Sequence, residues 1–186
     1  VFNSLAGAEG VSLLQVIDKC CSPMGARLLR SWLAMPVIDI EELDSRYDVV
    51  GHFVGDDDAL SALEVRLGEI GDLERIISRA AAGKILPREV MQLGRSLAQM
   101  DPVRELCCGT GVAELDRMMG STCECGALLE KIRTTMTESP AAAPGKGDII
   151  AAGVNVELDE LRDISRGGKD YLLKIQQREG ERTGIS

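Results

Sequence analysis

The longest regular pattern of the chain lies in residues 158–186, which read LDELRDISRGGKDYLLKIQQREGERTGIS. Apolar positions recur in this stretch at three- and four-residue steps, the spacing of one face of an α-helix. They are Leu158, Leu161, Ile164, Leu172 and Ile175, with Gly168 at the remaining step. The pattern predicts a single helix of 28 residues from Asn155 to Arg182, with a length of about 42 Å.

This predicted helix is as long as an entire domain. A compact domain of 186 residues has a diameter of about 40 Å, so the helix either crosses the domain or leaves it. Gly167 and Gly168 together lower helix stability by about 2 kcal/mol, which predicts a soft point or kink. Residues 155–182 hold six Lys and Arg against seven Asp and Glu, a balance that does not suit a DNA-binding strip.

The rest of the chain reads as short helices joined by short loops. The clearest helix has Ser22 as N-cap and Pro23 in its first position, and it ends before Pro36. Later helices are predicted to begin at Asp39, Asp56–Asp58, Gly71-Asp72, Pro87 and Asp101-Pro102, and near residues 111 and 124. In the helix after Asp39, the apolar positions at helical spacing are Leu43, Tyr47, Val50 and Val54.

No segment alternates as a β-strand does over a useful length. Aromatic residues make up only 3% of the chain, which favours helix-on-helix packing over a β-sandwich. We therefore predict an all-α fold, an irregular multi-helix bundle with a long C-terminal helix. The one long loop, ESPAAAPGKGD at 138–148, divides the chain into a helical core at 1–150 and the long helix at 151–186.

Composition narrows the class of protein. A compact domain of this length would bury roughly 70% of the surface of its unfolded chain. The net charge of −9 repels phosphates, so a stand-alone nucleic-acid binder is not expected. No apolar run of about 18 residues predicts a membrane helix, and no signal peptide is recognised. Val1 stands where a Met would begin a gene product, so we expect the chain to be part of a longer protein.

Motifs of catalysis are missing from the sequence. It has no G-x4-G-K-[ST] loop, since GKGD at 145–148 lacks both the spacing and the hydroxyl residue. It also has no G-x-S-x-G or H-E-x-x-H. The single histidine, His52, has no neighbouring Ser or Cys. We therefore predict no catalytic or cofactor-binding residues and no enzymatic activity in this chain itself.

Two other groups of residues have alternative interpretations. Arg27 and Arg30 are predicted to be solvated or salt-bridged, with phosphate binding as the alternative. Zinc sites usually have C-x2-C spacing or His ligands, so reduced thiols and no metal site are predicted, with a metal or redox protein as the alternative. The cysteines concerned are Cys20, Cys21, Cys107, Cys108, Cys123 and Cys125.

Three blocks of the sequence, in order, resemble the MutS family of mismatch-repair proteins. The first, SLLQVIDKCCSPMGARLLRSWLAMPVIDIEELDSRYDVV, is similar to the opening of that family's core domain. The second, GDLERIISRAAAGKILPREVMQLGRSL, resembles a later core segment. The third, GDIIAAGVNVELDELRDISRGGKDYLLKIQQREGERTGIS, contains G-x-[ND]-x-ELDELR and the ending ERTGI and looks like the lever that leads into the DNA clamp. Cys20-Cys21 and Gly180 depart locally from the family pattern.

The resemblance implies a function for the longer protein. MutS proteins are dimeric ATPases that bind mismatched double-stranded DNA and signal to MutL, so a homodimer, ATP or ADP with Mg²⁺, and a cytoplasmic, nucleoid-associated location are implied. Mismatch reading and ATP hydrolysis belong to domains that this chain does not contain, and the clamp is expected after Ser186. DNA-binding residues of this chain stay unknown. The alternative function is a stand-alone helical scaffold or interaction module.

Overall fold

The computed structural model describes residue 2 and residues 10–183, with only the backbone at 169, 174, 180 and 183. The described part is built from helices, and its one β feature is an isolated antiparallel bridge between Met136 and Ile150. The all-α prediction is therefore confirmed. The helices are α1 Leu13–Ile17, α2 Pro23–Ala34, α3 Ile40–Val54, α4 Asp57–Glu69, α5 Leu73–Ala81, α6 Pro87–Leu97, α7 Met100–Cys107, α8 Ala113–Gly120, α9 Gly126–Thr135 and α10 Val156–Thr183.

Local capping chemistry sets most of the helix starts. Besides α1 and α10, where Ser12 and Asn155 act in the same way, four starts have a side-chain oxygen that accepts a hydrogen bond from a backbone N–H three residues on, which satisfies a donor that the helix leaves free. The pairs are Ser22 with Gly25, Asp39 with Glu42, Asp56 with Ala59 and Asp72 with Arg75, at 3.1, 3.1, 2.9 and 3.2 Å. The helix starts predicted at these residues are confirmed.

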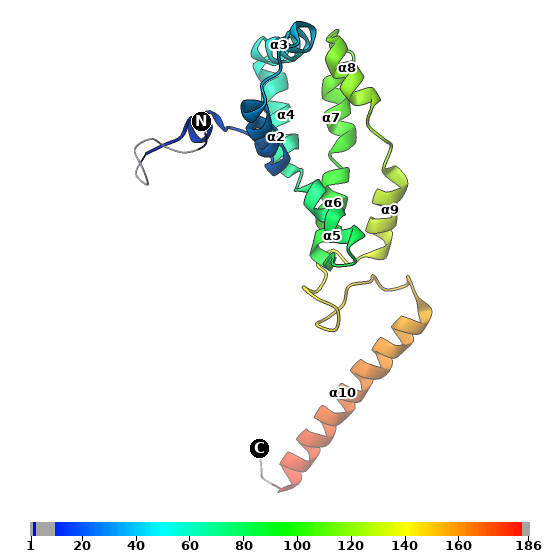
Figure 1. Cartoon of the computed structure of the whole chain (residues 1–186). Helices are drawn as coiled ribbons and strands as arrows, with labels where there is room; N and C mark the ends of the chain where they lie inside the picture. The colour runs from blue at the N-terminus through cyan, green and yellow to red at the C-terminus, as the bar shows by residue number, and fades with distance from the viewer. Residues whose placement is uncertain (1, 3–9, 184–186) are drawn as a thin grey trace.

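The helices form two groups, one above the other in Figure 1. In the upper group α3, α4, α7 and α8 pack around a small apolar core. In the lower group α6 packs against α5 and α9. The buried residues of the upper core are Phe53, Ile70, Val103, Cys107 and Leu115.

The two groups are joined where the α4–α5 turn lies against α6. Ser96 is fully buried there, and its hydroxyl accepts a hydrogen bond from Gly71 N and donates one to Gln92 O, both at 2.9 Å. A Cβ added to Gly71 would lie 2.8 Å from Gln92 Nε2. Glycine at 71 therefore permits the close approach of the turn to α6.

Most of the apolar positions at helical spacing in α3 do not face the core. Tyr47, Val50 and Val54 are exposed, with 64%, 58% and 73% of their surface accessible. Phe53 and Val49 face the core instead. Apolar periodicity locates a face that needs cover, but it does not say which neighbour provides the cover.

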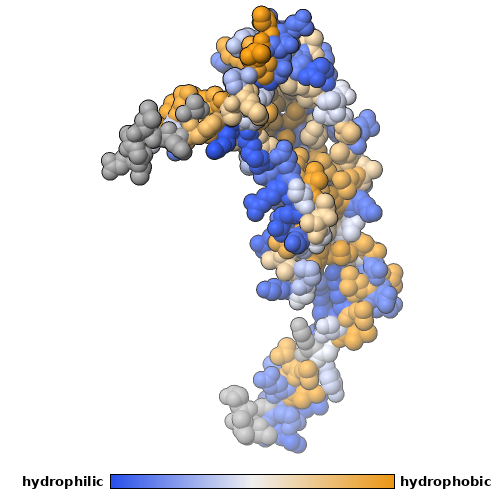
Figure 2. All heavy atoms as spheres, in the orientation of Figure 1, coloured by the Kyte–Doolittle hydropathy of each residue, from blue (hydrophilic) through white to orange (hydrophobic). Residues whose placement is uncertain are grey.

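The molecule is far from compact. Its accessible surface is 13475 Å², whereas a compact monomer of 20.0 kDa exposes about 8,700 Å². The chain buries about half of the surface of its unfolded form, less than the roughly 70% of a compact domain of this length. Figure 2 shows apolar side chains on the outside of both the bundle and α10. A surface of this kind is typical of a part that other protein surfaces cover.

Both arginines of α2 have partners inside the molecule. Arg27 donates two hydrogen bonds to the Asp72 carboxylate, each at 2.8 Å, and also pairs with Glu74. Arg30 lies over the Phe2 ring at 4.9 Å from its centroid. The salt-bridge interpretation of Arg27 is confirmed. This ion pair connects α2 to the start of α5 across 45 residues of sequence.

The Arg27 pair gives a stability that depends on pH. Hydrogen bonds from Arg27 hold the pKa of Asp72 below its ordinary value of 3.8. A lowered folded-state pKa contributes stability above the unfolded pKa, and this contribution is lost as pH falls through the lowered value. We expect Arg27→Gln to reduce the Tm by a few degrees at neutral pH, and the difference from wild type to close in acid. Thermal unfolding followed by circular dichroism across the acid range measures this. Arg30→Gln is the control, and an equal, pH-independent loss in both variants would contradict the prediction.

Candidate functional site: the joint at the base of the long helix

The element that sets this chain apart is α10, which runs away from the bundle as one continuous helix (Figure 1). Asn155 caps it: its side-chain oxygen accepts from Leu158 N at 2.9 Å and its carbonyl accepts from Asp159 N at 3.1 Å. The 28 residues that were predicted to be helical agree with the observed Val156–Thr183 within one residue at each end. Of the two courses open to such a helix, α10 leaves the bundle.

The chain between α9 and α10 is fixed before the helix begins. Beside the bridge of Met136 with Ile150, Thr137 N donates to Ile149 O at 2.9 Å and Ala151 N donates to Thr135 O at 2.8 Å. These bonds attach the segment that precedes α10 to the end of α9. The base of α10 is therefore connected to the lower helices by a short hydrogen-bonded ladder.

One arginine connects α10 with that ladder. The Arg162 guanidinium donates to Ile150 O at 2.9 Å and to Asp159 Oδ1 at 3.1 Å, and its Nε lies 3.1 Å from Asp148 Oδ1. Only 16% of the Arg162 side chain is accessible. A largely desolvated guanidinium with three acceptors in fixed directions is a stronger connection than an exposed ion pair.

Two further contacts complete this arrangement, which we call the joint: Asp148, Ile150, Gly153, Asp159, Arg162 and Arg166. Arg166 lies one turn further along α10 and donates to Asp148 Oδ2 at 2.7 Å. Gly153 N donates to Asp159 Oδ2 at 2.7 Å, with Gly153 at a φ of +84° that favours glycine. The joint holds the first three turns of α10 against the loop and leaves the rest of the helix projecting.

Sequence reasoning recognised the long helix but did not single out Asp148 or Arg162. A signal was present, because the motif G-x-[ND]-x-ELDELR at 153–162 contains Gly153, Asn155, Asp159 and Arg162. The structure shows that these four residues form the helix cap and half of the joint. The partner Asp148 comes from the loop that was predicted as the boundary.

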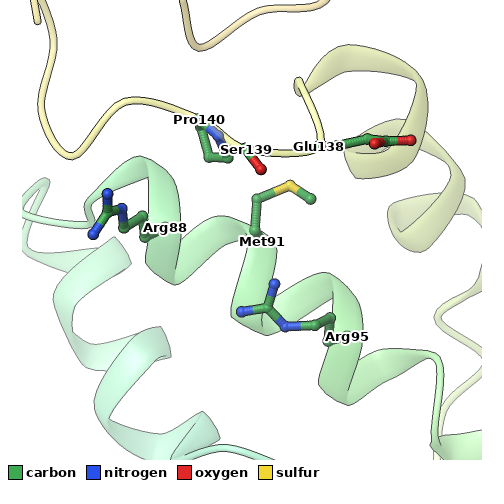
Figure 3. Close-up of a pocket in the computed structure, with 6 residues that line it drawn as sticks. All are labelled: Arg88, Met91, Arg95, Glu138, Ser139 and Pro140. Carbon is green, nitrogen blue, oxygen red and sulfur yellow. The ribbon is translucent and has the colours of Figure 1, made fainter. Parts of the chain in front are cut away.

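A shallow pocket of about 320 Å³ lies where the start of the same loop crosses α6 (Figure 3). Arg88, Met91 and Arg95 line it from the helix, and Glu138, Ser139 and Pro140 line it from the loop. Arg95 donates to Gln92 Oε1 at 2.8 Å. At this pocket the loop packs on α6, with Met91 between the two arginines along the helix.

The cysteines and His52 lie apart from the joint. Cys107 belongs to the upper core, where burial raises the pKa of its thiol. His52 packs edge-on against Phe53 with 4.9 Å between ring centroids. Over residues 10–183 and residue 2, no three His, Cys, Asp or Glu side chains are grouped as metal ligands would be. The same residues contain no helix long and apolar enough to span a membrane.

Comparison with known proteins gives one consistent result. Residues 1–182 match the family model described as MutS domain III. The chain is 46% identical over 177 residues to "DNA mismatch repair protein MutS" of Parabacteroides distasonis, covering 95% of this chain and 20% of the relative. The protein of the same name from Flavobacterium johnsoniae is 44% identical over 178 residues, 96% of this chain and 20% of the relative. The chain thus spans about a fifth of the length of these curated relatives.

Proposed function

Because the chain belongs to the MutS family, as a domain III, we propose that it is the core and lever of a longer mismatch-repair protein and transmits motion between a DNA clamp and an ATPase domain. The observation that carries this proposal is the joint. A helix that served only as a tether would need no fixed base. Here Arg162 holds the first turns of α10 to both the loop and the α9 ladder.

The finer parts of the proposal concern the full-length protein. We propose that it binds mismatched double-stranded DNA in an ATP-dependent way, uses Mg²⁺ with ATP or ADP, acts as a homodimer and signals to MutL in the cytoplasm. The names of the relatives support mismatch repair. This chain supplies no residue to nucleotide hydrolysis in the proposal, and its role is to couple the two sites mechanically.

We expect Arg162→Ala in the full-length protein to uncouple DNA binding from ATP hydrolysis. Loss of this guanidinium removes the contact of α10 with Ile150 and leaves Arg166 as its one partner for Asp148, so a change at the clamp reaches the core less efficiently. The increase in ATPase rate caused by a mismatched duplex should fall by roughly fivefold or more, the scale of typical coupling free energies. The ATPase rate without DNA should stay near wild type.

Arg178→Ala is the matched control, because Arg178 is an exposed arginine further along the same helix. It should keep the full DNA stimulation, and Arg162→Lys should restore part of it through the retained charge. Full stimulation in Arg162→Ala would contradict a lever fixed at this joint. Loss of the basal ATPase rate would show a folding defect instead.

A further inference from the structure

The outer face of α3 carries an apolar stripe that no other part of the described chain covers. It consists of Ile40, Leu43, Tyr47, Val50 and Val54, and we call it the α3 seam. Ile40, Tyr47, Val50 and Val54 are 58–73% exposed and Leu43 is half-buried. Figure 2 shows apolar surface beside hydrophilic surface at the end of the bundle where Figure 1 places α3.

The spacing of the seam identifies the shape of its partner. Its members follow one another at steps of three, four, three and four residues, the repeat of the contact positions in a coiled coil. From Ile40 to Val54 they extend over about 21 Å, or roughly four helical turns. Packing against a flat surface would not need apolar residues at this spacing. Packing against a second helix that runs alongside α3 does need it.

Charge identifies the chemistry of that second helix. Glu41, Asp44 and Asp48 line one edge of the seam, and within the described chain none of these carboxylates has an ion-pair partner. The single arginine of α3, Arg46, lies toward the opposite flank, where it pairs with Glu42 and stacks on the Trp32 ring at 3.8 Å from its centroid. The unpaired acidic edge therefore favours Lys or Arg on the helix that covers the seam.

A second copy of the chain does not fit this surface. Two α3 helices packed antiparallel about a two-fold axis would set their acidic edges along the same side, where like charges repel. The chain also carries a net charge of −9. By contrast, about four-fifths of the curated relatives lies outside the aligned region, and a segment of the same polypeptide is present at a high effective concentration.

We propose that the α3 seam is covered in the full-length protein by an amphipathic helix from another part of the same polypeptide, with Lys or Arg along one edge. Contact of this kind attaches a further domain to the upper helical group through α3. It is independent of the joint at α10, so failure of this proposal leaves the Arg162 test unaffected, and the reverse also holds.

Photo-crosslinking tests the proposal in the full-length protein. Tyr47 is replaced by p-benzoylphenylalanine, which keeps an aromatic ring at the seam, and crosslinked peptides are identified by mass spectrometry. We expect one dominant intramolecular crosslink to a segment with helical apolar spacing and flanking Lys or Arg. The same probe at Val65, which is 65% exposed on α4 but off the seam, is the control and should not reach that segment.

Charge reversal adds a second readout. Asp44→Lys combined with Asp48→Lys should lower the yield of the Tyr47 crosslink by roughly fivefold or more, because two favourable pairs become repulsive. Scattered crosslinks, or an absent crosslink, would overturn the proposal. A crosslink between ¹⁵N-labelled and unlabelled copies in a mixed sample would assign the seam to an intermolecular interface and overturn it as well. An unchanged crosslink yield after charge reversal would contradict the proposed Lys or Arg residues on the covering helix.

Discussion

Replacing Phe53 with alanine is expected to destabilise the chain by about 3–5 kcal/mol, the usual effect of removing a buried phenylalanine ring. Phe53 is 8% exposed and belongs to a core cluster with only four other buried residues. Its ring also makes the edge-on contact with His52. A small core cannot collapse around a lost ring without separating α3 from α4 and α8, so most of the cavity remains.

Urea unfolding followed by circular dichroism measures this effect as a lower midpoint. Folded proteins are stable by only about 5–15 kcal/mol, and this chain exposes more surface than a compact monomer. Much of the Phe53→Ala variant should therefore be unfolded in moderate urea. Val54→Ala is the control, since Val54 is the next residue but is 73% exposed. Equal midpoints in the two variants would contradict the assignment of Phe53 to the core.

The helices could be predicted from the sequence because their boundaries depend on local chemistry. Ser22 and Pro23 begin α2 through a side-chain cap and a preset φ, and neither needs a tertiary contact. The same holds for Asp72 at α5 and for Asn155 at α10. Each signal acts within four residues, so the sequence contains the whole interaction.

Packing was predicted less well, because it depends on residues far apart in the chain. The periodicity of Tyr47, Val50 and Val54 indicates one apolar face, but in the described chain these residues are exposed, so periodicity alone did not place them against a neighbour. The joint was missed for a related reason. Asp148 meets Arg162 across the loop and the helix start, and no local rule pairs two charges at that separation.

Replacing Gly167 and Gly168 with alanine is expected to have the second large effect on stability. The double variant should stabilise the helical state of α10 by about 2 kcal/mol. The structure shows α10 as one continuous helix through both residues (Figure 1), and a soft point at the pair stays a prediction. A Cβ at either position would meet no atom within 4 Å. Alanine therefore adds helix propensity without a clash, and it also reduces the conformational freedom of the unfolded segment.

Amide hydrogen exchange should reveal this change as slower exchange in the part of α10 beyond the joint, since local opening needs more free energy in the variant. Gly68→Ala in α4, where a Cβ also meets nothing within 4 Å, is the control and should leave exchange in α10 unchanged.

If the glycine pair serves as a flexure, the stiffened full-length protein should also respond differently to DNA at its clamp. Slower exchange with an unchanged DNA response would mean that α10 acts as a rigid lever whose only moving point is the joint at Arg162. Unchanged exchange would contradict the helix-stability argument itself.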